Sequence, residues 1–214
     1  MDAATRAWSR CFADGTPSRT AEPLVVQPPP QTDGSALAST LQYLTQTVTR
    51  HLIAAQTGHL LMMHAGAVSH PDTGASLVFV APSGTGKTTL ARLLGRSYGF
   101  LTDETVGIEP TTGRVHPYPK PLSLVPADGG AKLETSPDDL GLCRSHPSPT
   151  VARIIILSRP AGFNGAPRAA ELGTLGCDQR PGPGDVGVEQ APEPIADAGR
   201  PPGPHGSGLA LLVR

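Results

Sequence analysis

A glycine-rich loop at residues 81–89, with the sequence APSGTGKTT, sets narrow limits on how this chain can fold. An apolar run, LVFV at residues 77–80, predicts a short buried strand before the loop, and TLARLL at residues 89–94 predicts a helix after it. A strand, a glycine-rich loop ending in Gly-Lys-Thr, and a helix form the pattern of a phosphate-binding loop. We therefore expect an α/β fold in which this loop binds a nucleotide.

The residue types in the loop suit phosphate binding. Gly84 and Gly86 let the backbone curl so that successive N–H groups face phosphate oxygens, and the helix adds its positive N-terminal end. Lys87 is expected to reach the outer phosphates, and the Thr88 hydroxyl to hold Mg²⁺. The residues predicted to bind ATP are Ser83, Gly84, Thr85, Gly86, Lys87, Thr88 and Thr89, and those predicted to bind Mg²⁺ are Thr88 and Asp103.

Alanine stands at position 81, where the usual loop pattern begins with glycine. Alanine is the mildest replacement, although it would strain a backbone that needs a positive φ. A turn rich in Gly, Ser and Thr that merely precedes a helix is the alternative interpretation of the same residues. The flanking strand and helix favour the phosphate loop.

A helix and a β-hairpin are expected before the loop. Residues 60–68 form an apolar, strand-like run, and HPDTG at residues 70–74 predicts a tight turn into the strand that enters the loop. That arrangement predicts a mixed sheet with a hairpin feeding the loop, rather than the parallel sheet of most phosphate-loop folds. The helix is predicted over residues 35–57, where one helical face carries Leu37, Leu41, Leu44, Val48, Leu52 and Ile53.

An acidic pair, Asp103-Glu104, follows the next predicted strand at residues 100–102. Phosphoryl transfer needs a carboxylate near Mg²⁺ and a group that orients or deprotonates the attacking hydroxyl. If that strand lies beside residues 77–80, the pair emerges at the same sheet edge as the loop. Successive strand residues face opposite ways, so we expect only one of the pair to face the nucleotide. We favour Asp103 as base or metal ligand, Glu104 being the weaker candidate; a solvated acidic turn is the alternative.

Other candidates carry a weaker signal. His64 lies on the neighbouring hairpin strand and could approach the γ-phosphate, although a lone histidine on an apolar strand is more often a core residue. His116 and Lys120 are assigned no partner. Residues 151–157, VARIIIL, predict a central strand that is apolar on both faces, with Arg153 a remote candidate for charge stabilisation.

Three segments divide the chain. Residues 1–34 form an N-terminal segment and linker, in which Trp8 is expected to anchor the segment on the core. Residues 35–159 form the nucleotide-binding domain. Residues 160–214 are rich in Gly and Pro and lose hydrophobic periodicity, which predicts a disordered tail. A truncated or frame-shifted ending would produce the same abrupt loss of pattern.

Composition argues against several classes of protein. The formal net charge is −1, so no basic surface for nucleic acid or acidic membranes is indicated. No apolar run approaches the ~20 residues that span a bilayer, and no signal-peptide pattern opens the chain. The three cysteines (Cys11, Cys143 and Cys177) are odd in number and far apart, which argues against a disulfide framework. A soluble, cytoplasmic protein is expected.

Residues 63–124 resemble the HPr serine kinase/phosphorylase family and its distant relatives among small bacterial ATP-binding proteins. The resemblance rests on HAGAV at residues 64–68, SGTGKT at residues 83–88, the pair Asp103-Glu104, and GRV at residues 113–115. It covers roughly a third of the chain, and the ordered combination is more specific than the loop alone. It implies a P-loop fold like the nucleotide-binding core of phosphoenolpyruvate carboxykinase.

The resemblance also implies Mg-ATP and transfer of the γ-phosphate to a hydroxyl, with Asp103, Glu104 and His64 at the site, and it suggests a homo-oligomer. The family's paired aspartates appear here as Asp-Glu, and no counterpart of its C-terminal signature is found. Relatives of this reduced kind resemble accessory kinases of peptide-modification pathways, which makes HPr itself a poor expectation for the acceptor.

Two functions stay open at this point. The first is an ATP-dependent kinase acting on a hydroxyl of a protein, peptide or small molecule. The second is a nucleotide-binding module without catalysis. An ABC-type ATPase would carry a Leu-Ser-Gly-Gly-type signature, and a nucleoside-type kinase would carry an early loop and an arginine-rich lid; neither pattern is found.

Overall fold

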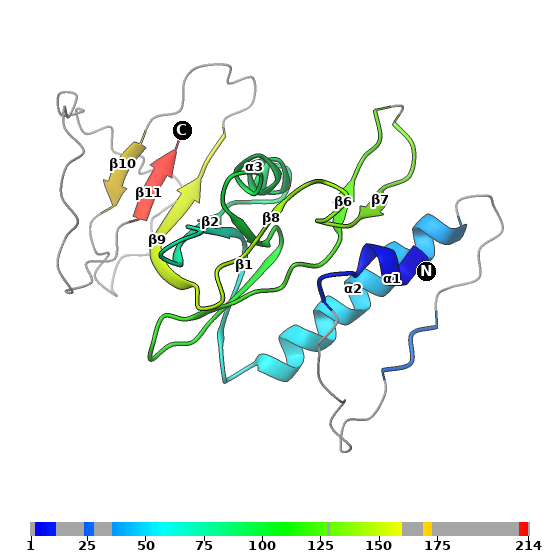
Figure 1. The fold of residues 1–214 in the computed structure, drawn as a ribbon, viewed down its shortest axis with the longest axis horizontal. Coiled ribbons are helices and arrows are strands. Elements are labelled where there is room, and N and C mark those ends of the chain that lie inside the picture. The colour runs from blue at the N-terminus through cyan, green and yellow to red at the C-terminus, as the bar shows by residue number, and fades with distance from the viewer. Residues whose placement is uncertain are drawn as a thin grey trace, which may run out of the picture.

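The computed structural model describes residues 3–11, 24–27, 36–127 and 129–159, together with the backbone of residues 169–172 and 210–213. Figure 1 shows a mixed α/β arrangement of these residues. The elements in chain order are α1 (Ala3–Ala7), α2 (Ala36–Gln56), β1 (Leu61–Ser69), β2 (Ala75–Val80), α3 (Lys87–Leu94), β3 (Gly99–Thr102), β4 (Thr105–Ile108), β5 (Val115–His116), β6 (Leu122–Leu124), β7 (Leu133–Thr135), β8 (Cys143–Arg144), β9 (Thr150–Leu157), β10 (Ala169–Leu172) and β11 (Ala210–Val213).

The expected hairpin is present. β1 pairs antiparallel with β2, and Ala65 lies opposite Val80 at the end that leads into the loop. Gly74 closes the turn with a φ of 72°, a conformation that favours glycine. The hairpin places the loop at the end of a strand that an antiparallel neighbour holds along its length.

The main sheet is mixed, as predicted. Its order across the described strands is β10-β11-β9-β2-β1-β3-β8, with β4 and β5 extending the β3 side of β1. β9 runs parallel to β2 and lies between β2 and β11, so its predicted central position is confirmed. Its burial is less complete than an apolar central strand suggests, because Ile156 is 40% exposed.

One expected neighbour relationship is wrong. The strand before the acidic pair, β3, pairs with β1 and not with β2. β1 is antiparallel to both β2 and β3, so β2 and β3 run in the same direction on either side of it. Their carboxyl ends therefore meet at the same edge of the sheet, and the acidic pair still comes out beside the loop.

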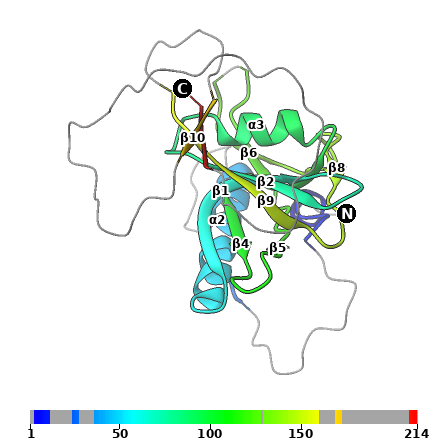
Figure 2. The same ribbon diagram turned by 90° about the vertical axis from the view of Figure 1, so that its left-hand side faces the viewer.

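Alternating side chains fill both faces of the sheet. One face buries Ala65, Ala67, Val78 and Leu101. The opposite face buries Phe79 and Phe100 against Ala91 of α3 and Leu122 of β6. Figures 1 and 2 show α3 and α2 on opposite sides of the strands. Because α3 is packed on its sheet face, the start of that helix is fixed relative to the end of β2.

The predicted helix over residues 35–57 is confirmed as α2. Part of its apolar face is open, and Leu44, Val48 and Leu52 line a cavity of about 600 Å³ with Trp8 and Tyr118.

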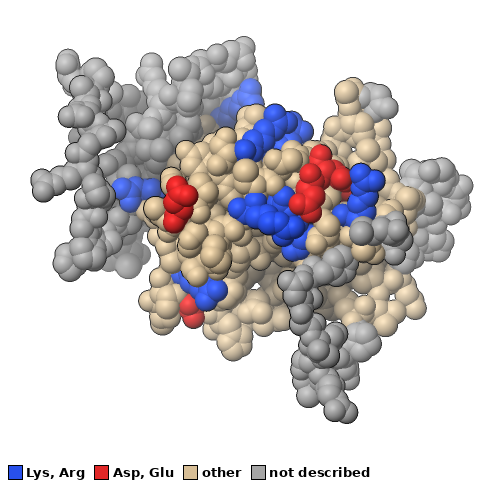
Figure 3. All heavy atoms as spheres, in the orientation of Figure 1, with Lys and Arg blue, Asp and Glu red and all other residues tan. Residues whose placement is uncertain are grey.

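No helix of the described residues has both the length and the apolar character to cross a bilayer. Figure 3 shows acidic and basic side chains intermingled on one face of the molecule.

The N-terminal segment is described only in part. α1 is followed by Trp8, which is buried, as expected for an anchor. Its ring lies 6.4 Å from that of Tyr118. Ion pairs of Arg6 with Asp139 (3.0 Å) and of Arg10 with Asp138 (2.8 Å) fix the same segment to residues far along the chain.

The expected disordered tail, residues 160–214, lies mostly outside the described residues. Two short pieces of it are described, and both are strands that extend the sheet. β11 runs parallel to β9, with Ala210 opposite Ile154, and β10 pairs antiparallel with β11. The sequence of residues 169–172 does not predict a strand.

Candidate functional site

The loop between β2 and α3 has the geometry of an anion cradle. Gly84 and Gly86 adopt φ values of 80° and 112°, in the region that favours glycine. A Cβ at either position would meet no heavy atom within 4 Å, so both glycines border open space. No side chain caps the start of α3. The first amides of that helix and the curled loop therefore face a space that a phosphate group can enter.

Lys87 stands at the first position of α3 and bends back onto its own loop. Its Nζ donates to the carbonyl oxygens of Ala81 at 2.6 Å and Pro82 at 3.1 Å. Burial lowers the pKa of Lys87, and the nearby charges of Glu104 and Asp103 partly oppose that shift. The lysine is thus held at the loop by carbonyl oxygens, with acidic groups close enough to act on its charge.

Thr88 connects the loop to the acidic pair. Its Oγ1 donates a hydrogen bond of 2.9 Å to Oδ2 of Asp103. The Asp103 side chain is only 4% exposed. A hydroxyl and a carboxylate oxygen thus lie side by side at the N-terminal end of α3.

Lys120 is the residue that sequence reasoning missed. Its side chain is 1% exposed, and its Nζ lies 3.0 Å from Oδ1 of Asp103 and 3.0 Å from Oε2 of Glu104. The two carboxylates raise the pKa of Lys120 against the opposing effect of burial, which is the largest single influence. The one signal in the sequence is a lysine between Pro119 and Pro121 in a segment with few charges.

Both carboxylates of the acidic pair lie at the candidate site, whereas strand alternation predicts that only one of them faces the nucleotide. Asp103 and Glu104 lie in a bend between β3 and β4, so the strand alternation does not separate them. Both reach the same ammonium group, but they differ in exposure, since the Glu104 side chain is 41% exposed. Asp103 is enclosed beside Thr88, and Glu104 is open to solvent.

One cavity brings most of the predicted site residues together. It has a volume of about 400 Å³ and is lined by His64, loop and helix residues, both carboxylates and Lys120. Of the predicted set, Thr85 alone does not line it. His64 is exposed, which argues against its alternative as a core residue. Arg153 lies on β9 and does not line this cavity.

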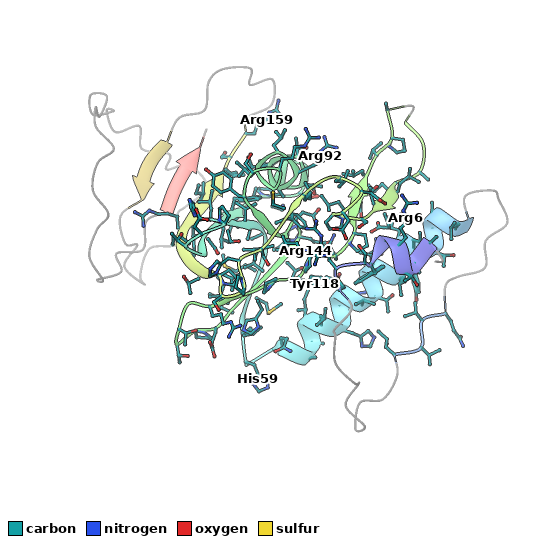
Figure 4. The ribbon with its side chains drawn as sticks, in the orientation of Figure 1. Arg6, His59, Arg92, Tyr118, Arg144 and Arg159 are labelled. Atoms are coloured by element: carbon teal, nitrogen blue, oxygen red, sulfur yellow. The ribbon has the colours of Figure 1, made fainter. Side chains whose placement is uncertain are left out.

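A third carboxylate, Glu134 of β7, fixes the surrounding elements. It accepts hydrogen bonds from Thr45 of α2 at 2.9 Å and from Ser123 of β6 at 2.5 Å. Burial raises the pKa of Glu134, and these hydrogen bonds oppose the rise. Tyr118, which is labelled in Figure 4, lies beside α2. Its hydroxyl and that of Thr49 of α2 form a hydrogen bond of 3.0 Å.

The donor set fits Mg²⁺, which prefers oxygen ligands and retains several waters. Thr88 and Asp103 supply a hydroxyl and a carboxylate at the mouth of the loop. Oδ1 of Asp103 is buried and lies 3.0 Å from Nζ of Lys120. The described residues contain no cluster of three or more His, Cys, Asp or Glu arranged as a metal site. Any magnesium here therefore needs ligands from a bound phosphate or water as well.

Comparisons with known proteins add little. No protein-family model matches the chain, and no curated protein matches it. Among solved structures, the chain has a weak match to the HPr(Ser) kinase/phosphatase from Coxiella burnetii. The TM-score is 0.31 and the sequence identity 15%, over 52% of this chain and 77% of the other. A likeness at this level says nothing about function.

Proposed function

We propose that the chain binds Mg-ATP in the loop at residues 81–89 and transfers the γ-phosphate to a hydroxyl acceptor. The observation that carries the proposal is the convergence of Thr88, Asp103, Glu104 and Lys120 at the open mouth of the loop. A phosphate cradle, an enclosed carboxylate and an accessible carboxylate are the groups that phosphoryl transfer requires. Magnesium would neutralise charge on the phosphate oxygens.

The site residues have separate roles in this proposal. Loop amides and the Lys87 ammonium hold the phosphates; for this, Lys87 has to exchange the carbonyl oxygens of Ala81 and Pro82 for phosphate oxygens. Thr88 and Asp103 would hold the metal. Lys120 contacts no phosphate in this scheme, but it keeps both carboxylates in place.

Glu104 is the group placed to handle the acceptor, because it is the accessible carboxylate of the pair. The acceptor hydroxyl loses its proton to Glu104 as its oxygen bonds to the γ-phosphorus. The bond from that phosphorus to the β–γ bridging oxygen breaks, and ADP leaves with the electron pair. His64 lines the same cavity and would contact the incoming hydroxyl or the γ-phosphate.

Nucleotide binding without transfer is the second candidate. One observation favours it, since Lys120 neutralises charge on both carboxylates. A base held by an ammonium group is less ready to take a proton.

The two candidates differ in one assay. ATP labelled in the γ-phosphate is incubated with the protein and with three acceptor classes: serine peptides, free serine and a simple alcohol. The proposal predicts label on an acceptor, abolished by Asp103→Asn and strongly reduced by Glu104→Gln. Nucleotide binding with no label on any acceptor would contradict the kinase and support the non-catalytic nucleotide-binding module.

A further inference from the structure

The first half of β1 has one edge without a strand partner. β2 pairs with residues 65–69 of β1 only. On the other edge, β4 pairs with residues 61–64. This pairing continues the register in which Ala67 lies opposite Thr102 of β3, so β3 and β4 lie on the same edge of β1. Within the described chain, no strand pairs with residues 61–64 on the side of β2.

The backbone groups on that edge can be assigned. The N–H of Ala65 donates to the carbonyl of Glu104 at 3.0 Å, so it faces the β4 side. Because N–H and C=O groups alternate between edges along a strand, those of Met62 and His64 face the opposite, unpaired edge. Leu61 is 53% exposed and His64 is also exposed, so solvent reaches this part of the strand.

A groove beside residues 62–64 of β1 reaches the proposed site. It has a volume of about 430 Å³, and it lies between α2, which contributes Arg50 and Ile53, and the strands, which contribute Met62 and Met63. His64 and Glu104 line both this groove and the cavity at the loop. The unpaired edge therefore ends where the acceptor hydroxyl has to arrive.

We propose that residues 61–64 of β1 bind an extended polypeptide segment as an added strand, and that this segment carries the acceptor hydroxyl to Glu104. The inference rests on the proposed function and narrows its acceptor to a polypeptide. An exposed strand edge recognises a peptide backbone through main-chain hydrogen bonds. A small alcohol cannot satisfy two alternate backbone positions of one strand.

The groove also suggests a side-chain preference. Arg50 is its one cationic residue among the described lining, and its Nε donates to the carbonyl of Gln46 at 3.3 Å. Glu104 is paired with Lys120 at the other end. Methionine side chains adapt to many apolar shapes. A segment with an acidic residue a few positions from its serine or threonine, and apolar residues between, fits this groove.

Hydrogen exchange tests the pairing without requiring turnover. The protein, saturated with a non-hydrolysable ATP analogue, is mixed with a pool of short acetylated peptides with a fixed central serine, randomised flanks and one fixed acidic residue. Amide exchange is followed by NMR. We expect slower exchange at the Met62 and His64 amides and no change at the Met63 amide, which the β4 ladder already holds. The same pool with N-methylated backbones should give no protection.

A pair of variants tests the edge directly. Met62→Pro removes the N–H that faces the unpaired edge but no hydrogen bond to β4, whereas Met62→Ala removes only the side chain. We expect about tenfold weaker peptide binding for Met62→Pro, the effect of one or two hydrogen bonds, and little change for Met62→Ala. Mg-ATP affinity and the unfolding temperature of Met62→Pro check that the fold is intact.

The outcomes separate the two proposals. Unchanged exchange at Met62 and His64 with the peptide pool, in protein that binds the ATP analogue, would overturn the added strand. Label transferred to a simple alcohol but to no peptide would also overturn the added strand, while it would support the kinase activity. Protection of both amides, with no label on any acceptor, would support the strand but contradict the kinase.

Discussion

The Thr88 hydroxyl donates a 2.9 Å hydrogen bond to Oδ2 of Asp103, which joins the start of α3 to the bend after β3. The two residues are 15 positions apart: Thr88 lies on α3, which follows β2, and Asp103 follows β3, and β1 separates β2 from β3 in the sheet. This hydrogen bond holds the carboxylate of Asp103 beside the glycine-rich loop.

The contact predicts a selective effect on magnesium. Thr88→Val removes the hydroxyl at nearly constant volume, and Thr88→Ser retains it. We expect Thr88→Val to weaken the magnesium-dependent part of ATP binding by about tenfold, because one oxygen ligand is lost. The measurement is ATP affinity with and without Mg²⁺. Equal losses in both conditions would argue against a metal role for Thr88.

Lys120 should be necessary for stability. Lys120→Met leaves Asp103 buried without its cation, which costs about 3–5 kcal/mol in the free energy of unfolding. Adding Asp103→Asn removes the uncompensated charge, so the double variant should recover part of the loss. Denaturant unfolding measures both. A Lys120→Met variant as stable as wild type would contradict the buried ion pairs.

Much of this fold could be predicted from sequence because its signals are local. The hairpin has a turn pattern at residues 70–74, α2 has a helical apolar face, and the loop has its glycines and Lys87. The sheet order could not be predicted in the same way. Nothing in residues 99–102 distinguishes β1 from β2 as the neighbour of β3, because both are apolar strands that alternate between two buried faces.

Local sequence patterns indicate only some of the residues at the candidate site. Thr88 and Asp103 each belong to a recognisable pattern. Lys120 acquires its partners only through the path of residues 117–121, where the N–H of Tyr118 donates to the carbonyl of Leu101 of β3 at 3.0 Å. The sequence also leaves the bend at Asp103 and Glu104 open, since the end of a strand and an acidic turn both fit these residues. The effect of the bend is to bring both carboxylates to one ammonium group.

Gly66 of β1 should tolerate no side chain. A Cβ there would lie 2.1 Å from Cε2 of Phe79, whose ring is fully buried. Gly66→Ala is therefore expected to destabilise the protein by about 1–3 kcal/mol through overpacking. Combining it with Phe79→Leu should cost less than the sum of the two single changes, because the smaller side chain makes room. Strictly additive losses in thermal unfolding would contradict this packing.

Cys11 should react slowly while the protein is folded. Burial raises the pKa of its thiol to about 11, and the charge of Lys120 opposes the rise only in part. The folded state therefore favours the protonated thiol. The contribution of this thiol to the free energy of unfolding is complete below its unfolded pKa, about 8.5, and is lost as the pH rises toward its folded pKa, about 11. Alkylation of Cys11, followed by mass spectrometry of its peptide, should accelerate over this pH range and on unfolding. Rapid alkylation at neutral pH would contradict the burial.

Binding of Mg-ATP by the loop is tested most directly by calorimetry on the wild type, Lys87→Ala and Arg96→Ala. Arg96 is an exposed cation beyond the far end of α3, so its removal controls for general charge. We predict measurable Mg-ATP binding that weakens by about ten- to a hundredfold in Lys87→Ala, from lost charge-assisted hydrogen bonds, and is unchanged in Arg96→Ala. Wild-type protein that binds no Mg-ATP, or a Lys87→Ala variant that binds it equally well, would contradict a nucleotide site at this loop.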